Sequence, residues 1–360
     1  MVKLILLGLL AGALFSSTFI LNEFMSDAGG HWFWSASLRY IFMWLIITAL
    51  IVFQHGFGRV KALLAIFIAH WRFWCVTGGI GFGVFYTGIC FAADHVAGWV
   101  VAATFMFTVV TSLLVLLAFG QRFDKKFIIY ALLVFLGVVL VNVSEGLRAS
   151  EVQLAAASMT DMLIFGALPA LIAAFSYPIG NQLVWQVSFN SRKHTAELRR
   201  MRDPAAHDDV AELETTAKPA AQSKKPPSQL ALLIAKIPAL ETDLLQDAFN
   251  KVWLMTLGSI PYWLVLGLII RPDMPSTSQV FNTLLVAILA GVGATSIFLF
   301  AREQAQTSSE VAGVDSTQAS EVIFALIGGI LLLGNTVPSL MGLIGIGLIM
   351  LGLVLFAKDG

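Results

Sequence analysis

Long runs of apolar residues, separated by short polar stretches, recur along the chain. Most of the runs approach the roughly 20 residues that a helix needs to cross the hydrocarbon core of a bilayer. The pattern therefore predicts about ten transmembrane helices. They are expected at residues 3–22, 36–54, 72–92, 97–119, 126–143, 162–184, 250–270, 281–301, 312–333 and 338–357.

Composition supports this prediction. Of the 360 residues, 58% are hydrophobic and only 12% are charged, with a mean hydropathy of +0.84. Soluble domains have about 25% charged residues, so this chain has too little polar surface to cover a water-soluble body. The formal net charge is zero, which gives no indication of a nucleic-acid partner. We therefore predict an all-α polytopic membrane protein.

The two cysteines, Cys75 and Cys90, fall in one apolar run. On a single helix they are too far apart to form a disulfide with each other. The spacing of Cys and His residues does not indicate a metal site, and no cofactor is expected.

Positive charges indicate how the helices are oriented. If the N-terminus is cytoplasmic and the helices alternate, all 22 Lys and Arg residues except Arg39, Arg148 and Arg271 fall on the inner side. Cytoplasmic loops are enriched in these residue types. We therefore expect a multi-pass protein of the cell (inner) membrane with both termini in the cytoplasm.

A polar segment interrupts the apolar pattern after the sixth run. Residues 187–229 are rich in charge, Ala, Pro and Ser, which is typical of a disordered linker. Residues 229–248 are apolar but too short and too charged to span, so we expect an amphipathic helix on the inner leaflet, acting either as a docking element or as a spacer. The predicted organisation is a first five-helix repeat at 1–144, an outer loop and the sixth helix at 145–186, a cytoplasmic linker with its amphipathic helix at 187–249, and the four remaining helices at 250–360.

The linker divides the predicted helices into two sets of five. Because five is odd, the second set must enter the membrane from the opposite side, as in transporters built from inverted repeats. Segments 15–22 and 175–182 both begin with Phe-Ser, and segments 81–87 and 290–296 are both glycine-rich. These similarities occur in the same order in each half and predict two inverted five-helix repeats.

Several short patterns of residue type, none of them a strict signature, point to a known family. The first helix carries small and polar residues from Gly8 to Thr18, and an Ala-x-Leu-Arg-Tyr stretch ends at Tyr40. In the third helix Trp74 precedes a glycine-rich face, and in the ninth the segment 321–334 is an apolar run that opens with Glu. In these features the chain resembles the drug/metabolite transporter superfamily, specifically its putative multidrug resistance efflux transporter family. The resemblance covers both halves but not the linker. It implies a ten-helix inverted repeat that exports small organic solutes, often coupled to protons.

Glu321 is the first candidate for a functional residue because it lies inside the ninth predicted helix. A charged residue at the centre of a membrane helix costs about 2.5–3.5 kcal/mol, which the apolar residues after it can offset. Its carboxylate should face the bundle or a water-filled cavity, where it can carry a proton or bind a cationic solute. Alternatively, it pairs with Arg302 or lies near the cytoplasmic interface. Gln318 shares its face and can bind solute or tie helices together.

Two residues of the sixth helix and one of the first are further candidates. Tyr177 and Asn181 flank Pro178, which frees a backbone carbonyl that can bind solute where it lines a cavity; a packing kink is the alternative. Ser17 lies at the depth where small four-helix relatives carry a coupling glutamate. Its hydroxyl can bind solute or bond back to its own helix.

Aromatic and hydroxyl groups elsewhere complete the set. The hydroxyls of Tyr86 and Thr104 can, like that of Ser17, bind solute or bond back to their own helix. Trp263 can stack on an aromatic or cationic solute or serve helix packing. Arg39 is expected to pair with Glu23 or Asp27 near the outer surface, or to attract anionic solute to the entrance.

Together these observations predict a secondary active transporter that exports small organic solutes by alternating access. Its expected partners are the solute, a proton or other coupling ion, and the lipid bilayer; a homodimer is left open. A membrane-embedded enzyme acting on a lipid-linked substrate is the main alternative, but Asp94 and His95 are its only close polar pair, with no serine nearby. A non-transporting scaffold or sensor is the second alternative.

Overall fold

The computed structural model describes residues 2–119, 125–151, 159–202, 237–238, 240, 242–305 and 308–359. Every regular element among them is a helix, and ten helical stretches are long and apolar enough to cross a membrane. The predicted all-α fold with ten spans is thus confirmed. We number the stretches spans 1 to 10: Val2–Asp27, Trp32–His55, Trp71–Ala93, Gly98–Ala118, Lys125–Arg148, Met159–Asn190, Ala248–Ile270, Thr277–Arg302, Gly313–Leu333 and Leu340–Asp359.

Five spans are formed by single helices, and five are assembled from shorter segments. The single helices are α1 (Val2–Asp27), α2 (Trp32–His55), α8 (Lys125–Glu151), α13 (Ala248–Ile270) and α18 (Leu340–Asp359). The assembled spans are α4 (Trp71–Gly78) with α5 (Phe85–Ala93), α6 (Gly98–Phe105) with α7 (Thr108–Ala118), α9 (Met159–Asp161) with α10 (Leu168–Arg202), α14 (Thr277–Val286) with α15 (Thr295–Glu303), and α16 (Ser308–Ser316) with α17 (Ser320–Gly328).

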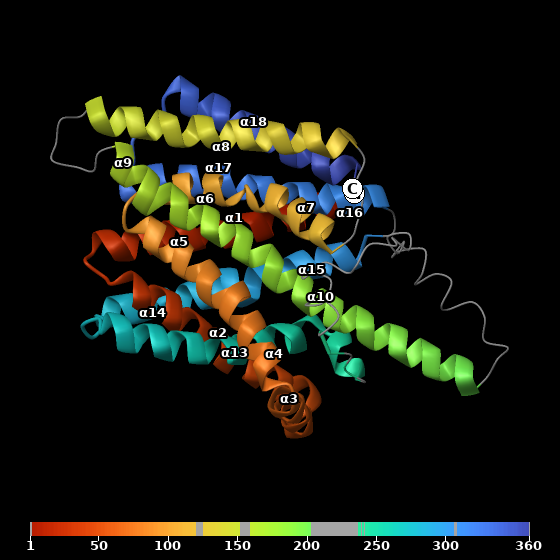
Figure 1. Cartoon of the computed structure of the whole chain (residues 1–360). Helices are drawn as coiled ribbons and strands as arrows, with labels where there is room; N and C mark the ends of the chain where they lie inside the picture. Colours follow the sequence, from red (N-terminus) through yellow and green to blue (C-terminus); the bar gives the residue numbers. More distant parts are fainter. Residues whose placement is uncertain are drawn as a thin grey trace, which may run out of the picture.

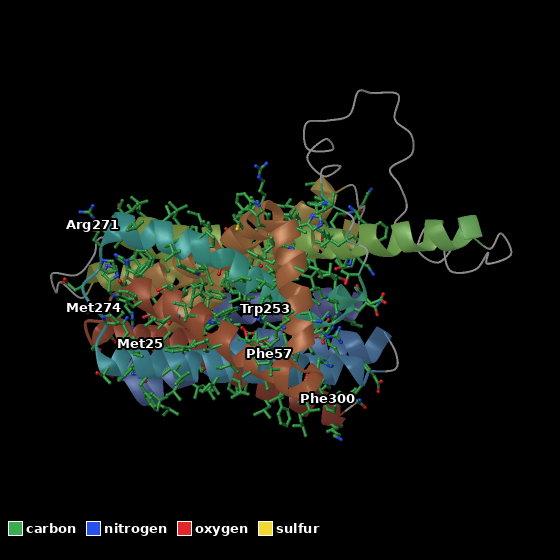
Figure 2. All side chains as sticks on the ribbon, turned by 90° about the horizontal axis from the view of Figure 1, so that it is seen from below. Met25, Phe57, Trp253, Arg271, Met274 and Phe300 are labelled. Atoms are coloured by element: carbon green, nitrogen blue, oxygen red, sulfur yellow. The ribbon has the colours of Figure 1, made fainter. Side chains whose placement is uncertain are left out.

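Polarity is distributed as expected for a protein in lipid. Large apolar side chains such as Leu268 and Leu331 are about three-quarters exposed, at 74% and 76%. Polar side chains such as Asn22, Gln279 and Thr283 are buried. Hydrocarbon satisfies apolar groups at the surface, whereas polar groups must find partners inside the bundle. In Figure 2 the sticks on the outside of the bundle are mostly carbon.

The packing of the spans is repeated when the two halves are exchanged. Span 1 packs on spans 8 and 9, and span 6 packs on spans 3 and 4; span 2 packs on span 8, and span 7 on span 3. Spans 5 and 10 pack on each other, as α8 and α18 do along one side of the bundle in Figure 1. The glycine-rich segments of spans 3 and 8 both form π-helical turns, at Gly79–Val84 and Ala287–Ala294. These equivalences support the predicted inverted repeat.

Glycines bring the two halves into backbone contact. A Cβ atom on Gly81 of span 3 would lie 2.9 Å from Gly180 Cα of span 6, and a Cβ atom on Gly258 of span 7 would lie 2.1 Å from the carbonyl oxygen of Trp74. Real Cβ atoms do not come this close, so only glycine permits these approaches. The glycine-rich face of the third helix thus serves close helix packing, as small residues do in membranes generally.

One helix was not predicted from the sequence. Helix α3 (Phe57–Ala69) lies between spans 2 and 3 and crosses them steeply, so that it is seen nearly end-on in Figure 1. At 13 residues it is too short to span. Leu63 is its buried residue, while Phe57, Leu64 and Ile68 are exposed.

The end of span 6 and the start of span 7 differ from the sequence prediction. Helix α10 continues to Arg202, well into the segment 187–249, because the change in composition at 187 ends the apolar run but not the helix. Most of the predicted amphipathic helix at 229–248 lies outside the described residues. Its described part contains only a short 3₁₀ turn, Asp243–Gln246, and Leu245 is buried against protein. This part therefore contacts the bundle.

Candidate functional site

Glu321 lies in the middle third of span 9, near the start of α17. Its side chain is half-buried and has no hydrogen-bond or ion-pair partner among the residues that the structure describes. The sequence left open a pair with Arg302, but that guanidinium binds Asp315 instead, with Nε 3.0 Å from Oδ1. Glu321 is therefore an unpaired acid at membrane depth.

Tyr177 of span 6 is the tyrosine on which Glu321 has an electrostatic effect. Its half-buried hydroxyl lies within electrostatic reach of the carboxyl of Glu321 and is hydrogen-bonded with Asn181. Its ring packs against Phe85 of span 3 and Phe105 of span 4, with centroids 5.0 and 5.9 Å away. Tyr177 is thus packed against aromatic rings of the other half, within electrostatic reach of Glu321.

Gln318 lies one 3₁₀ turn before Glu321, in the segment Thr317–Ala319, and its side chain is exposed. Residues three apart in such a turn share a face. The neighbouring face is fixed by span 1, because a Cβ atom on Gly8 would lie 2.3 Å from Thr317 Oγ1 and one on Gly12 would lie 2.4 Å from Ser320 Oγ. Span 9 is thus fixed closely against span 1 at two residues that precede Glu321 within about one helical turn.

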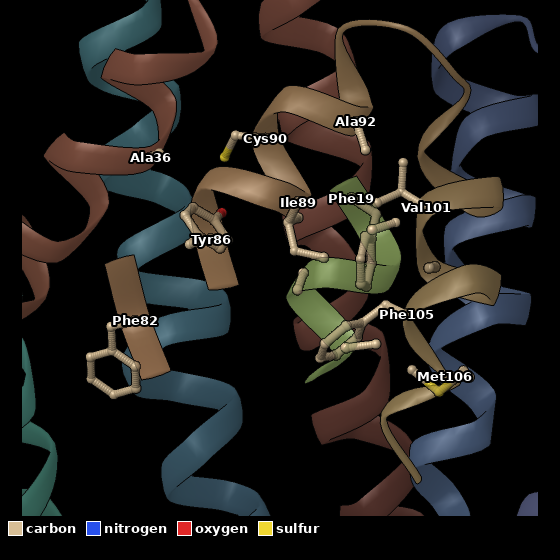
Figure 3. Packing of buried hydrophobic residues seen from close by; sticks show 14 of the residues in the cluster. Phe19, Ala36, Phe82, Tyr86, Ile89, Cys90, Ala92, Val101, Phe105 and Met106 are labelled. Atoms are coloured by element: carbon tan, nitrogen blue, oxygen red, sulfur yellow. The ribbon is translucent and has the colours of Figure 1, made fainter. Parts of the chain in front are cut away.

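Arg39 is the main functional candidate whose surroundings the sequence did not predict. Its side chain is only 8% exposed, and it makes no ion pair with any described residue, so the expected pair with Glu23 or Asp27 is wrong. The guanidinium lies over the ring of Tyr86, 4.1 Å from its centroid, and Nη1 is 3.4 Å from Thr18 Oγ1. In Figure 3 the side chains of Tyr86 and Cys90 lie on the side of their helix that faces the helix carrying Ala36.

These contacts offset only part of the cost of burying Arg39. A cation over an aromatic ring gains about 2 kcal/mol when desolvated, whereas a buried ion costs several kcal/mol. In addition, the Arg39 Nε–H is fully buried and has no acceptor among the described groups. The signal that could have located this site is the helix start: span 2 begins at Trp32 and not at 36, so Arg39 lies about two turns inside the helix.

Glu23 has a different environment, although it too is buried within a span. One carboxylate oxygen accepts a hydrogen bond from the Gly98 N–H at the first turn of α6, and the other accepts one from Asn335 Nδ2, both at 2.7 Å. A carboxylate at a helix N-terminus satisfies unpaired N–H groups and complements the helix dipole. Glu23 thus joins span 1 to span 4 and to the loop between spans 9 and 10.

The remaining predicted residues make local or packing contacts. Ser17 donates to the Leu14 carbonyl at 2.6 Å, within its own helix. Thr104 accepts from Asn142 Nδ2 at 2.8 Å, joining spans 4 and 5. Trp263 is buried, stacks on Tyr40 at 5.9 Å and donates to Ser259 at 3.3 Å. Tyr86 alone of this group lies against an unpaired charge.

The carbonyl freed by Pro178 is occupied by protein. A proline in a helix leaves the carbonyl four residues earlier without its usual partner, here that of Ala174. The hydroxyl of Thr111 in span 4 donates a hydrogen bond to this carbonyl. The proline therefore serves helix packing at this position.

The polar pair of Asp94 and His95, in the loop between spans 3 and 4, is also engaged. Asp94 lies between spans 3 and 4; burial raises the pKa of its carboxyl, although a hydrogen bond with Ser26 acts in the opposite direction. Ser26 supplies the serine that was not expected nearby. His95, however, bonds through Nδ1 to the Phe91 carbonyl at 2.8 Å and stacks on Phe165. Ser26 is thus hydrogen-bonded to the acid, whereas a catalytic triad has the histidine between the serine and the acid.

No group of three or more His, Cys, Asp or Glu side chains within the described ranges is arranged to hold a metal ion. Cys75 and Cys90 are both free, as predicted. The site thus combines a carboxylic acid, Glu321, with a permanently charged guanidinium, Arg39.

Comparison with known proteins gives consistent results. A family model described as "EmrE: Putative multidrug resistance efflux transporter" matches residues 2–359. The chain is 31% identical over 361 residues to the "Uncharacterized protein YjlA" of Bacillus subtilis (strain 168), covering 98% of this chain and 94% of the relative. It is 28% identical over 314 residues to an uncharacterized 42.1 kDa protein of Shouchella clausii, covering 84% of this chain and 65% of that relative.

Proposed function

Because the chain belongs to the putative multidrug resistance efflux transporter family, we propose that it is a secondary active transporter that exports small organic solutes in exchange for protons. The observation that carries the proposal is Glu321, an acid at membrane depth without a partner among the described residues. In this account Glu321 binds a proton in one state and the cationic group of a solute in the other.

The physical reason is competition for one carboxylate. An unpaired charge in the membrane is costly, so Glu321 is favoured either protonated or next to a cation. A proton and a cationic group cannot occupy it together. Binding of one therefore promotes release of the other, and a linkage of this kind is reciprocal. An inward proton gradient then drives outward movement of solute.

The pairing of the spans supports alternating access. If the two five-helix halves are inverted repeats, the outward-open and inward-open states exchange the roles of equivalent helices around one midplane site. Spans 6 and 9, which carry Tyr177 and Glu321, then move against spans 1 to 4 of the other half. The backbones of spans 3 and 6 meet directly at Gly81 and Gly180, where small residues let the two helices approach closely.

We also propose that the protein lies in the cell (inner) membrane with both termini in the cytoplasm. The C-terminal end of α18 and the extension of α10 lie at the same end of the bundle (Figure 1). Arg271 and Met274 lie at the opposite end (Figure 2). With the positive charges weighted toward the first end, that end faces the cytoplasm.

Transport into inside-out membrane vesicles tests the function. The vesicle lumen is made acidic, and one of two dyes is added outside: ethidium, a cation, or rhodamine B, a zwitterion. We expect vesicles with the wild-type protein to accumulate at least one dye above vesicles without it, and Glu321→Gln to abolish the gradient-driven part. Accumulation by Glu321→Gln with an unchanged dependence on the gradient would contradict the proposal, as would the absence of any gradient-driven accumulation by the wild type.

A further inference from the structure

Arg39 carries a charge for which the described residues supply no counter-ion. The acids at this end of the bundle are engaged elsewhere or face outward. Glu23 accepts from Gly98 and Asn335, Asp94 is hydrogen-bonded with Ser26, and Asp27 is exposed. By contrast, Arg148 and Arg302 each contact a carboxylate, Glu145 and Asp315 respectively.

The donors of Arg39 are also incompletely used. Its Nε–H is buried without an acceptor, and the contact of Nη1 with Thr18 Oγ1 is 3.4 Å, longer than an ordinary hydrogen bond. A hydrogen bond with the hydroxyl of Tyr86 is its other polar contact, and that hydroxyl already accepts from Asn22 Nδ2 at 3.0 Å. A guanidinium presents its N–H groups as a fork that fits a carboxylate or phosphate. An incoming anion would satisfy both the charge and the free donor.

The surroundings of Arg39 are aromatic. Tyr40 stacks on Phe82 at 4.9 Å and on Trp263 at 5.9 Å, and it meets Tyr86 edge-on at 5.7 Å. Tyr177 lies within electrostatic reach of Arg39 as well as of Glu321. Arg39 thus lies beside a group of aromatic rings, which suits a solute whose aromatic body carries an anionic group.

We propose that Arg39 binds the anionic group of the transported solute, so that the substrates are small aromatic or apolar organic compounds carrying a carboxylate or a similar anion. This inference rests on the proposed transport function and specifies its substrate class. Glu321 then receives the cationic end of a zwitterionic solute in place of its proton. Arg39 lies in the outer half of span 2 and Glu321 near the middle of span 9, so the solute is oriented along the transport path.

Four probes that share a phenyl group and a short chain test the substrate class. They are 3-phenylpropionate (anion), phenylalanine (zwitterion), 3-phenylpropanol (neutral) and phenethylamine (cation), each titrated to millimolar concentration while the thermal midpoint of the purified full-length protein is followed. Ligands that bind the native state raise this midpoint. The variants are Arg39→Gln and Arg39→Lys, with Arg148→Gln as the matched control, since Arg148 already has a carboxylate partner.

We expect 3-phenylpropionate, phenylalanine or both to raise the midpoint of the wild type and of Arg148→Gln, with the neutral probe weaker. Arg39→Gln should weaken their binding by about tenfold or more, since a charge-assisted hydrogen bond is lost. Arg39→Lys, which keeps the charge, should retain part of the affinity and keeps the test valid if Arg39→Gln does not fold. A larger response to phenylalanine than to 3-phenylpropionate identifies zwitterions as the preferred members of the class.

Three results would overturn the inference: no shift with either carboxylate in the wild type, a shift that persists unchanged in both Arg39 variants, or shifts with phenethylamine or 3-phenylpropanol alone. The vesicle experiment separates this failure from failure of the transport function. Gradient-driven dye transport with no Arg39-dependent anion binding refutes the substrate class only. Arg39-dependent binding with no gradient-driven transport refutes the coupled function only.

Discussion

Glu23 and Glu321 are both acids inside membrane spans, but the protein treats them in opposite ways. Both oxygens of Glu23 accept hydrogen bonds at 2.7 Å, from the Gly98 N–H and from Asn335. Glu321 has no such partner among the described residues. A carboxylate that is fully hydrogen-bonded can contribute to folding, whereas one without partners costs stability. The comparison indicates that Glu23 holds its end of the bundle together, whereas Glu321 is left without a structural partner among the described residues and suits the binding role proposed above.

The arginines show the same contrast. Arg148 and Arg302 each contact an acid, while Arg39 is buried over Tyr86 without one. Arg39 and Glu321, in spans 2 and 9, are thus a cation and an acid inside the bundle that have no ion-pair partner among the described residues. Natural proteins are often locally unfavourable at functional sites, and the cost is offset elsewhere in the structure. Substitutions can test this division of roles.

Glu23→Ala should have the largest effect on stability. It leaves the Gly98 N–H and Asn335 Nδ2 without their acceptor, and each hydrogen bond to a charged group contributes about 1.5–3 kcal/mol. We expect a loss of about 3 kcal/mol or more, measured as a lower thermal midpoint in detergent. Asp27→Ala, one turn further along and exposed, is the control and should change stability by less than about 0.5 kcal/mol. Equal effects of the two variants would refute the structural role of Glu23.

Gly98→Ala should have the next largest effect, because it disturbs the other side of the same contact. The added Cβ would lie 2.5 Å from the Phe19 carbonyl oxygen and 3.0 Å from Glu23 Oε2. Overpacking of this kind costs about 1–3 kcal/mol. Gly347→Ala is the matched control, since nothing lies within 4 Å of its Cβ position and alanine favours the helix. If the two variants have the same midpoint, the close approach at Gly98 is not a constraint.

Glu321→Gln should have the smallest effect on stability. The substitution removes a charge without breaking a hydrogen bond to any described residue, so we expect a midpoint equal to or slightly above that of the wild type, within about 1 kcal/mol. The same change at Glu23 replaces a charged acceptor by an amide and should lower the midpoint. A marked loss of stability in Glu321→Gln would show that its carboxylate has a structural partner after all.

The spans could be predicted from the sequence because lipid requires apolar side chains over most of each helix. The same rule placed the end of span 1 at 22, whereas α1 continues to Asp27, since Asn22 and Glu23 are buried by protein and not by lipid. It also missed α3, which is too short to span. Hydropathy reports contact with lipid and does not report which polar residue meets which.

The site was predicted in part for the same reason. Glu321 was found because a single acid in an apolar run is conspicuous in the sequence. That Arg302 binds Asp315, that Thr111 occupies the carbonyl freed by Pro178, and that Arg39 lies over Tyr86 all depend on contacts between distant spans. Such contacts follow from helix packing, which residue spacing along one helix cannot specify.

Proton release on solute binding tests the central claim about Glu321 most directly. The dye that the vesicle experiment selects is added to purified wild-type, Glu23→Gln and Glu321→Gln protein in weakly buffered detergent solution, and the change in pH is recorded against the amount bound. We expect about one proton released per bound solute from the wild type and from Glu23→Gln, and none from Glu321→Gln, because binding and protonation compete for one carboxylate. Release from Glu321→Gln equal to that of the wild type would contradict the account.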